Sequence, residues 1–280
     1  MSTVDETGLL GGSDDHIAKI RRELGESAAD RKPSPPGAEP VIRLENVSLS
    51  FGRRQILKSV SLEARKGETL MVAGESGSGK STILKLILRL LVPDSGRIHV
   101  FDDEVELLTF QEALEMRRQI GMVFQNAALF DSLTVYENVA YPLRENTDMD
   151  EKDIEAAVAE KLAFVNLSPK VVSNQLPSQL SGGMRKRVGI ARAIATNPKI
   201  ILYDEPTAGL DPLTVGTINE LVLKLQRELD VTSLVVTHDI RAGFSVASRV
   251  NLLREGEIVF DGSPEEMVAS DDQYIKAFLS

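Results

Sequence analysis

The sequence predicts an α/β fold in which helices cover a mostly parallel sheet, with a helical insertion at residues 126–195. Strand-like and helix-like segments alternate along most of the chain, which is typical of this class. Two short segments, KIILYDEP and SLVVTHD, are almost entirely apolar, as expected of strands buried on both faces. With 280 residues, 42% of them hydrophobic, the chain can form one large domain or two small ones.

The composition excludes several classes of protein. The chain has no cysteine, so neither disulfides nor cysteine-bound zinc can contribute, in keeping with a reducing cytosol. Its net charge of -10 disfavours a broad nucleic-acid-binding surface. The first residues lack the basic start and apolar core of a signal peptide, and no apolar segment approaches the ~20 residues of a membrane span. We therefore expect a soluble chain, in which any membrane role must come through a partner.

Residues 1–40 differ from the rest in composition and are predicted to form an N-terminal extension. A short helix is predicted from Asp14 to Leu24, with three apolar side chains on one face and Gly25 at its end. The segment RKPSPPGAEP that follows has four prolines in ten residues, which is typical of an extended linker. We expect this extension to be flexible, and docking of its helix on a partner is the alternative.

From Val41 onward the chain reads as a succession of strands and helices. The predicted strands are VIRLENVSLSF and VSLEARKGE, paired around a turn at Gly52, then ETLMVAG, SGRIHVFDDEV, IGMVF, the two apolar segments named above, and a closing hairpin, RVNLLREGEIVFDG, that turns at Gly256. The predicted helices are STILKLILRLL, residues 112–118, and a helix beginning at Asp150 with Ile154, Val158, Leu162 and Val165 on one face.

The segment GESGSGKS, from Gly74 to Ser81, matches the phosphate-loop pattern G-x-x-x-x-G-K-[ST]. It lies between a predicted strand and a predicted helix, which is the setting that the pattern requires. Glycines let successive amides point inward at phosphate oxygens, and the helix dipole adds a favourable field. Lys80 supplies a charge toward the outer phosphates, and the Ser81 hydroxyl is a candidate Mg²⁺ ligand.

Polar residues follow other predicted strands. Asp204 and Glu205 end one apolar strand, so Asp204 is a candidate metal ligand and Glu205 a candidate base for water, although acids at strand ends are often solvated turn residues. His238 ends a second strand and could contact a γ-phosphate, or it could be structural. Gln125, after IGMVF, could reach the metal or the water. Phe51 could stack on adenine or pack in the core.

The stretch LSGGM presents Ser181 as an N-cap, followed by two glycines at the start of a helix. Glycine is costly inside a helix, so the pair suits an anion that approaches the backbone at the helix start.

In this order, GESGSGKS, Gln125, LSGGM, ILYDEP, AGLDP and His238 resemble the motifs of the ATP-binding-cassette (ABC) ATPases, across residues 41–260. The resemblance implies a P-loop NTPase fold with a mixed β-sheet core, an antiparallel β subdomain and a helical signature subdomain. It implies a nucleotide-binding domain at 41–262, with a helical subdomain at about 126–195 and a tail helix at 263–280.

The resemblance also implies a role for each matching residue. Phe51 matches the residue that stacks on adenine, Gln125 the metal-sensing glutamine, Asp204 the metal-binding acid, Glu205 the catalytic acid and His238 the switch histidine. Asp211 matches a loop at the dimer interface. The ATP phosphates are expected to contact the phosphate loop, namely Gly74, Glu75, Ser76, Gly77, Ser78, Gly79, Lys80, Ser81 and Thr82, and the signature of the other subunit, namely Ser181, Gly182 and Gly183. ATP, Mg²⁺ and a homodimer with two shared sites follow from this resemblance.

Within the family, three features are similar to the Mla/Mce lipid-transport group: the stretch from Gln125 to Glu145, Met184 in the signature, and the ending SDDQYIKAFL. This similarity implies a membrane permease, a periplasmic Mce-type lipid-binding protein and a candidate small regulatory subunit. It places the chain on the cytoplasmic face of the inner membrane, without nucleic acid.

The permease is expected to contact the apolar residues Ala127 to Phe130, unless Leu129 and Phe130 only pack the helical arm. We expect the basic run from Arg185 to Arg187 to be a solvated helix face. Two other functions remain open: transport of a different cargo, and a soluble cassette ATPase that acts on ribosomes or DNA.

Overall fold

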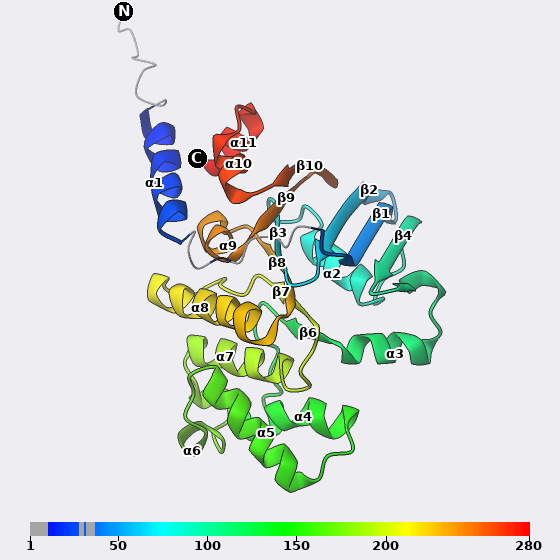
Figure 1. The fold of residues 1–280 in the computed structure, drawn as a ribbon, viewed down its shortest axis with the longest axis vertical. Coiled ribbons are helices and arrows are strands. Elements are labelled where there is room, and N and C mark those ends of the chain that lie inside the picture. Colours follow the sequence, from blue (N-terminus) through cyan, green and yellow to red (C-terminus); the bar gives the residue numbers. More distant parts are fainter. Residues whose placement is uncertain (1–10, 28–30, 32–36) are drawn as a thin grey trace, which may run out of the picture.

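The computed structural model describes residues 11–27, 31 and 37–280, and it confirms the predicted α/β class (Figure 1). The strands are β1 (Pro40–Phe51), β2 (Arg54–Arg65), β3 (Thr69–Ala73), β4 (Ser95–Val100), β5 (Asp103–Glu104), β6 (Ile120–Val123), β7 (Ile200–Asp204), β8 (Thr232–Thr237), β9 (Arg249–Arg254) and β10 (Glu257–Gly262). The helices are α1 (Gly11–Ser27), α2 (Lys80–Ile87), α3 (Phe110–Arg118), α4 (Val135–Asn146), α5 (Glu151–Phe164), α6 (Pro169–Val172), α7 (Gly182–Ala193), α8 (Pro212–Leu229), α9 (Ile240–Val246), α10 (Pro264–Ala269) and α11 (Gln273–Leu279), with short 3₁₀ turns at Val105–Leu107 and Pro177–Gln179.

A four-stranded antiparallel sheet, in the order β2-β1-β4-β5, carries the first strands of the fold. The predicted pairing of the first two strands is confirmed, and Phe51 pairs with Arg54 across the tight turn. Gly52 has a φ of 61° in this turn, a conformation that glycine adopts without a steric penalty. The sheet therefore holds Phe51 at the end of β1, next to the turn.

A six-stranded sheet, in the order β10-β9-β3-β8-β7-β6, forms the centre of the molecule. All neighbours in it are parallel except β10, which is antiparallel to β9 at the edge. Every residue of β3 and β8 is buried, which explains their apolar sequences. Since β8 separates β3 from β7, the acids at the end of β7 and the histidine after β8 lie at the same sheet edge as the phosphate loop.

A helical layer made of α4 to α7 lies between β6 and β7 in the sequence, and α8 lies between this layer and the central sheet (Figure 1). The apolar face predicted for the helix after Asp150 is buried in this layer, with Ile154, Val158 and Leu162 at most 2% exposed. Asp150 caps that helix by accepting a hydrogen bond from the Asp153 amide at 2.9 Å.

The N-terminal helix α1 packs against α9, α10 and α11 (Figure 1). The predicted apolar face is buried there, since Ile20 is 2% and Leu24 is 4% exposed beside Phe244 and Met267. The helix predicted from Asp14 to Leu24 is therefore present, and its apolar face covers apolar side chains of the closing elements, while the flexibility of the extension stays a prediction. The helix also continues past Gly25 to Ser27. Residues 1–10, 28–30 and 32–36 lie outside the described residues.

The tail is two short helices, α10 and α11, rather than the single helix expected at 263–280. Each has its own N-cap: Ser263 accepts from the Glu266 amide, and Asp272 accepts from the Tyr274 and Ile275 amides. Because each N-cap begins a helix of its own, the tail forms two helices instead of one. None of the helices within residues 11–27 and 37–280 is long and apolar enough to cross a bilayer.

Candidate active site

The phosphate loop connects β3 to α2, as its pattern predicts. Its glycines Gly74, Gly77 and Gly79 have φ values of 156°, 80° and 110°. A Cβ atom on Gly74 would lie 2.4 Å from the carbonyl oxygen of Leu253, a contact that no side chain tolerates. The backbone of the loop therefore follows a curved path that requires glycine at these positions. Its amides border a concave space.

Lys80 extends back along this loop from the first turn of α2. Its ammonium donates to the carbonyl oxygens of Gly74 at 2.7 Å and Glu75 at 3.0 Å. The Glu205 carboxylate is 3.8 Å away, and the Lys80 side chain is only 6% exposed. Burial lowers the pKa of Lys80, and the nearby Glu205 and Asp204 oppose that shift. The loop thus holds a partly desolvated cation at its centre.

Three oxygen-bearing side chains, two of them in contact, are candidates to hold a metal ion beside the phosphates. The Ser81 hydroxyl donates to Asp204 Oδ1 at 2.7 Å, and Gln125 lines the same cavity as Ser81. Hydroxyl, carboxylate and amide oxygens are hard ligands of the kind that Mg²⁺ prefers, so the donor set fits that ion. Across the described part of the chain, no three His, Asp or Glu side chains could hold a metal by themselves. Phosphate and water oxygens would have to complete the coordination.

Glu205 is 9% exposed and is held by the last residue of β8 and by the residue after it. Thr237 Oγ1 donates to Glu205 Oε2 at 3.0 Å, and His238 Nδ1 lies 2.9 Å from Glu205 Oε1. The backbone of Glu205 has a φ of 49°, the left-handed region that non-glycine residues rarely occupy. The carboxylate is therefore fixed at the floor of the cavity by contacts that override an unfavourable backbone conformation.

These groups enclose a cavity of about 350 Å³. It is lined by Phe51, Arg54, Ile56, Ser76, Gly77, Gly79, Lys80, Ser81, Thr82, Gln125, Glu205 and His238. Phe51 is 53% exposed at its rim, so the alternative of core packing is wrong for this residue. The structure thus brings the phosphate loop, Gln125, Glu205 and His238 together with an aromatic ring.

The signature residues lie elsewhere. Ser181 caps α7 by accepting from the Met184 amide at 3.2 Å, and Gly182 lines a separate hollow with Gln125 and Gly209. Asp211 caps α8, accepting from the amides of Leu213 and Thr214, each at 3.1 Å. Neither the signature nor Asp211 lines the phosphate-loop cavity of its own chain.

Lys186 is a residue that the sequence interpretation missed, because the basic run around it was expected to be a solvated helix face. In the structure Lys186 is 6% exposed, and its ammonium donates to the backbone carbonyls of Gln125 and Glu205. The available signal was its spacing, since Lys186 precedes the buried Gly189 and Ile190 by three and four residues.

Two further contacts were not anticipated. Thr237 holds Glu205, and its position just before His238 in an apolar strand is the only signal for it. The Tyr274 hydroxyl of α11 lies 3.5 Å from Glu75 Oε1, and the Arg254 guanidinium stacks 3.9 Å from the Tyr274 ring. The tail therefore reaches the phosphate loop.

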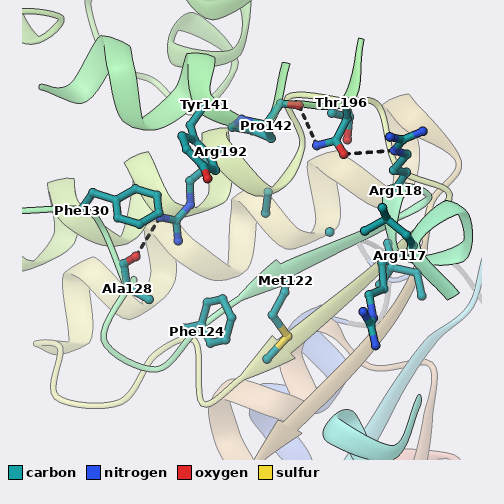
Figure 2. A pocket seen from close by; sticks show the side chains of 15 residues that line it. Arg117, Arg118, Met122, Phe124, Ala128, Phe130, Tyr141, Pro142, Arg192 and Thr196 are labelled. Carbon is teal, nitrogen blue, oxygen red and sulfur yellow. Dashed lines mark hydrogen bonds between the residues drawn. The ribbon is translucent and has the colours of Figure 1, made fainter. Parts of the chain in front are cut away.

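A larger groove, of about 500 Å³, lies beside Gln125 on the side of the helical layer (Figure 2). Phe124, Phe130 and Tyr141 line it, and the Phe130 and Tyr141 rings are 5.0 Å apart. Phe130 is 44% exposed, whereas Leu129 packs against the helical core. Leu129 therefore packs the helical arm, and contact of Phe130 with a permease stays a prediction.

Comparison with known proteins agrees with this geometry. The sequence model of the ABC transporter family matches residues 57–208, more than half of the chain. The chain is 36% identical over 239 residues to the intermembrane phospholipid transport system ATP-binding protein MlaF of Haemophilus influenzae, covering 85% of this chain and 90% of that protein. It is 37% identical over 239 residues to mkl of Mycobacterium tuberculosis, named as a probable ribonucleotide transport ATP-binding protein, covering 85% of this chain and 66% of that protein.

Among solved structures, the dimeric post-hydrolysis state of the ATP-binding cassette MJ0796, bound to ADP and Pi, superposes with a TM-score of 0.73 at 37% identity. The match covers 80% of this chain and 98% of that one. The family inferred from the motif order is thereby confirmed: the chain belongs to the ABC transporter family and is one of its ATP-hydrolysing subunits.

Proposed function

We propose that the chain is the ATPase of a phospholipid transporter, that it acts as a head-to-tail homodimer, and that it drives a membrane permease docked in the groove beside Gln125. The observation that carries this proposal is the groove itself, an apolar, cation-edged surface that adjoins the nucleotide cavity through a single loop.

The dimer is supported by the separation of the signature from the phosphate loop. Ser181 to Gly183 present a capped helix start to the surface, at a distance from the cavity of their own chain. Two copies arranged head to tail would place this helix start over the phosphate of the other copy, giving two equivalent sites. The related cassette MJ0796 is dimeric, in keeping with this arrangement.

In such a site, the loop amides and Lys80 bind the phosphates and Phe51 stacks on adenine. Glu205 accepts a proton from the attacking water, and His238 and Thr237 keep the carboxylate aimed at it. Ser81, Gln125 and Asp204 would hold Mg²⁺, which supplies charge neutralisation of the phosphates. Loss of the γ-phosphate removes the contact between the two copies, so hydrolysis opens the dimer.

The groove is suited to an amphipathic protein segment (Figure 2). Its lining combines the apolar side chains of Met122, Phe124 and Phe130 with the guanidinium groups of Arg118 and Arg192. No acidic side chain is among its lining residues. We infer that the permease inserts a short helix with apolar residues and at least one acidic residue, on the cytoplasmic face of the membrane. Movement of this segment would reach Gln125 through residues 126–130.

The experiment is co-purification of the tagged chain from membranes of its own host. Phe130→Asp places a charge in the groove and is expected to abolish recovery of an integral membrane protein. The isolated variant should retain ATP hydrolysis within about threefold of the unaltered chain, since Phe130 does not line the nucleotide cavity of its own chain.

Val171→Asp is the matched control, because Val171 is an exposed apolar residue of the helical layer, 64% exposed, outside the groove. It should leave the membrane partner bound. Recovery of the partner with Phe130→Asp, or its loss with Val171→Asp, would contradict docking in the groove.

Cargo is a separate question, because mkl is named for ribonucleotides. We favour phospholipid, since the match spans 90% of MlaF and only 66% of mkl. Transport by the purified complex in proteoliposomes distinguishes the two cargoes. ATP-dependent movement of a fluorescent phospholipid supports the proposal. Uptake of a labelled ribonucleotide without lipid movement supports the alternative. An MlaF-type complex would also include a periplasmic Mce-type protein and a small regulatory subunit.

A further inference from the structure

Lys186 carries a buried charge that the proposed mechanism does not use. It lies on α7, one turn after the signature, and its side chain is 6% exposed. Burial lowers the pKa of Lys186, and the Glu205 carboxylate opposes that shift. A lysine in such a place costs stability unless its ammonium is well bonded, so its partners indicate what it does.

Those partners are two backbone carbonyls of the active site. The Lys186 ammonium donates to the Gln125 carbonyl in a short hydrogen bond and to the Glu205 carbonyl at 3.4 Å. Gln125 follows strand β6 and Glu205 follows strand β7, whereas Lys186 comes from the helical layer. One ammonium therefore joins the two residues expected to contact the metal and the water to a helix outside the central sheet.

Both carbonyls belong to backbone segments that need external support. Glu205 is in the left-handed region, and besides Lys186 its peptide groups contact the Val236 carbonyl at 2.9 Å and the Ala208 amide at 3.2 Å. Ala127 and Ala128, just after Gln125, have φ values of 59° and 47°. Non-glycine residues keep such conformations only where neighbouring contacts over-determine them.

The rest of α7 holds the same loop. Arg192 donates to the carbonyls of Ala127 and Ala128, each at 2.8 Å. A Cβ on Gly189 would lie 3.2 Å from the Ala127 Cβ, so helix and loop are in close contact. Lys186, Gly189 and Arg192 thus all contact residues 125–128. Of these three, only Lys186 also forms a hydrogen bond with Glu205.

We propose that Lys186 is a positioning residue for ATP hydrolysis: its ammonium fixes the peptides of Gln125 and Glu205 and ties both to the signature helix. A displacement of α7 is then transmitted to the Glu205 carboxylate without a change in the phosphate loop. The nucleotide is bound by the loop, and Lys186 acts on the geometry of the hydrolytic step. This inference concerns the ATPase reaction alone, so it stands whether or not the permease and the cargo proposed above are correct.

The test compares Lys186→Met with Lys161→Met in steady-state ATP hydrolysis and in equilibrium binding of a fluorescent ATP analogue. Lys161 is a matched control: it is a buried lysine of the same helical layer, 5% exposed, and its ammonium donates to Asn197 at 2.8 Å, away from the cavity. Lys186→Met is expected to lower kcat by about 10–100-fold, with the Kd for nucleotide changed less than about threefold. Lys161→Met is expected to lower thermal stability and to leave kcat within about threefold.

A second measurement is local. Amide hydrogen exchange in the peptides that contain residues 125–128 and 204–208 should rise in Lys186→Met and stay unchanged in Lys161→Met. Lys186→Arg, which keeps a cation able to donate to both carbonyls, should recover most of kcat. If Lys186→Met does not fold, Lys186→Gln replaces it in every comparison, because its amide is tolerated in a polar buried position.

The proposal is overturned by a kcat within twofold of the unaltered chain in Lys186→Met, or by a parallel loss of kcat and nucleotide binding. It is also overturned if Lys161→Met loses kcat to the same extent, or if Lys186→Arg is no more active than Lys186→Met.

Discussion

Three consecutive residues at the end of β7 show how closely core and catalytic demands are combined. Tyr203 is completely buried, Asp204 accepts a hydrogen bond from Ser81, and Glu205, just after the strand, lines the cavity. Glu205 occupies a left-handed backbone conformation, which costs on the order of 1–3 kcal/mol. Since Tyr203 anchors the strand immediately before this point, the core supplies the rigidity that holds the carboxylate in place.

Burial raises the pKa of the Tyr203 hydroxyl above its usual range. In the unfolded chain this hydroxyl ionises near pH 10, while the native state keeps its proton, so the native state binds more protons above pH 10. The free energy of unfolding must then fall as pH rises, by up to about 1.4 kcal/mol per pH unit. Tyr203→Phe lacks this group and should show a shallower decline between about pH 10 and 11, measured by urea unfolding. Parallel pH curves for the two proteins would contradict this.

Among the elements, α1 is the one that comes from the N-terminal extension. It covers α9, which begins two residues after His238, and it is attached through Ile20, Leu24 and a contact of 3.8 Å between Glu23 and Arg241. The attachment is small compared with the central sheet, so we expect α1 to detach locally before the rest of the fold unfolds.

Ile20→Ala removes most of a side chain that is 2% exposed, a change that costs about 2–5 kcal/mol in a well-packed core. Because α1 can detach alone, the expected result is faster amide exchange across residues 16–25, with the exchange of β3 and β8 unchanged. Arg22→Ala, an exposed position on the same helix, is the control and should have little effect. Unchanged exchange in Ile20→Ala would mean that another contact holds the helix.

The elements also show which features a sequence reveals. The phosphate loop, the two buried strands and the Asp150 helix depend on local signals such as glycine spacing, apolar runs and caps, and they were predicted correctly. The docking of α1 and the burial of Lys186 depend on surfaces that meet only after folding, more than 200 residues apart for Ile20 and Phe244. The break between α10 and α11 also has a local signal, because Asp272 is a residue type that favours N-caps and it caps α11.

At the scale of the whole molecule, the positions of the motifs bear on how two copies of the chain could share a nucleotide site. Lys80 lines the phosphate-loop cavity and Ser181, the N-cap of α7, does not, so a site that uses both residues requires one from each copy. The sequence suggested this sharing only through family resemblance, because no local pattern states which chain supplies the signature.

Mixing two defective chains tests the shared site. Lys80→Ala removes the loop cation, and Ser181→Arg blocks the signature. Each homodimer then has no intact site, whereas a mixed dimer has one. If half of the dimers are mixed, ATP hydrolysis should return to about a quarter of the unaltered rate. Turnover by either variant alone at the unaltered rate would rule out the shared site, and analytical ultracentrifugation should confirm that both variants still pair.

The contact between α11 and the phosphate loop has a practical consequence. Tyr274 stands 3.5 Å from Glu75, and Ala277, one turn further along the same helix, is exposed to solvent. Because the chain contains no cysteine, Ala277→Cys would create a unique attachment point for a fluorophore close to the nucleotide, on an element that forms no part of the cavity. The arrival and departure of ATP could then be followed optically, in real time, with the catalytic groups left untouched.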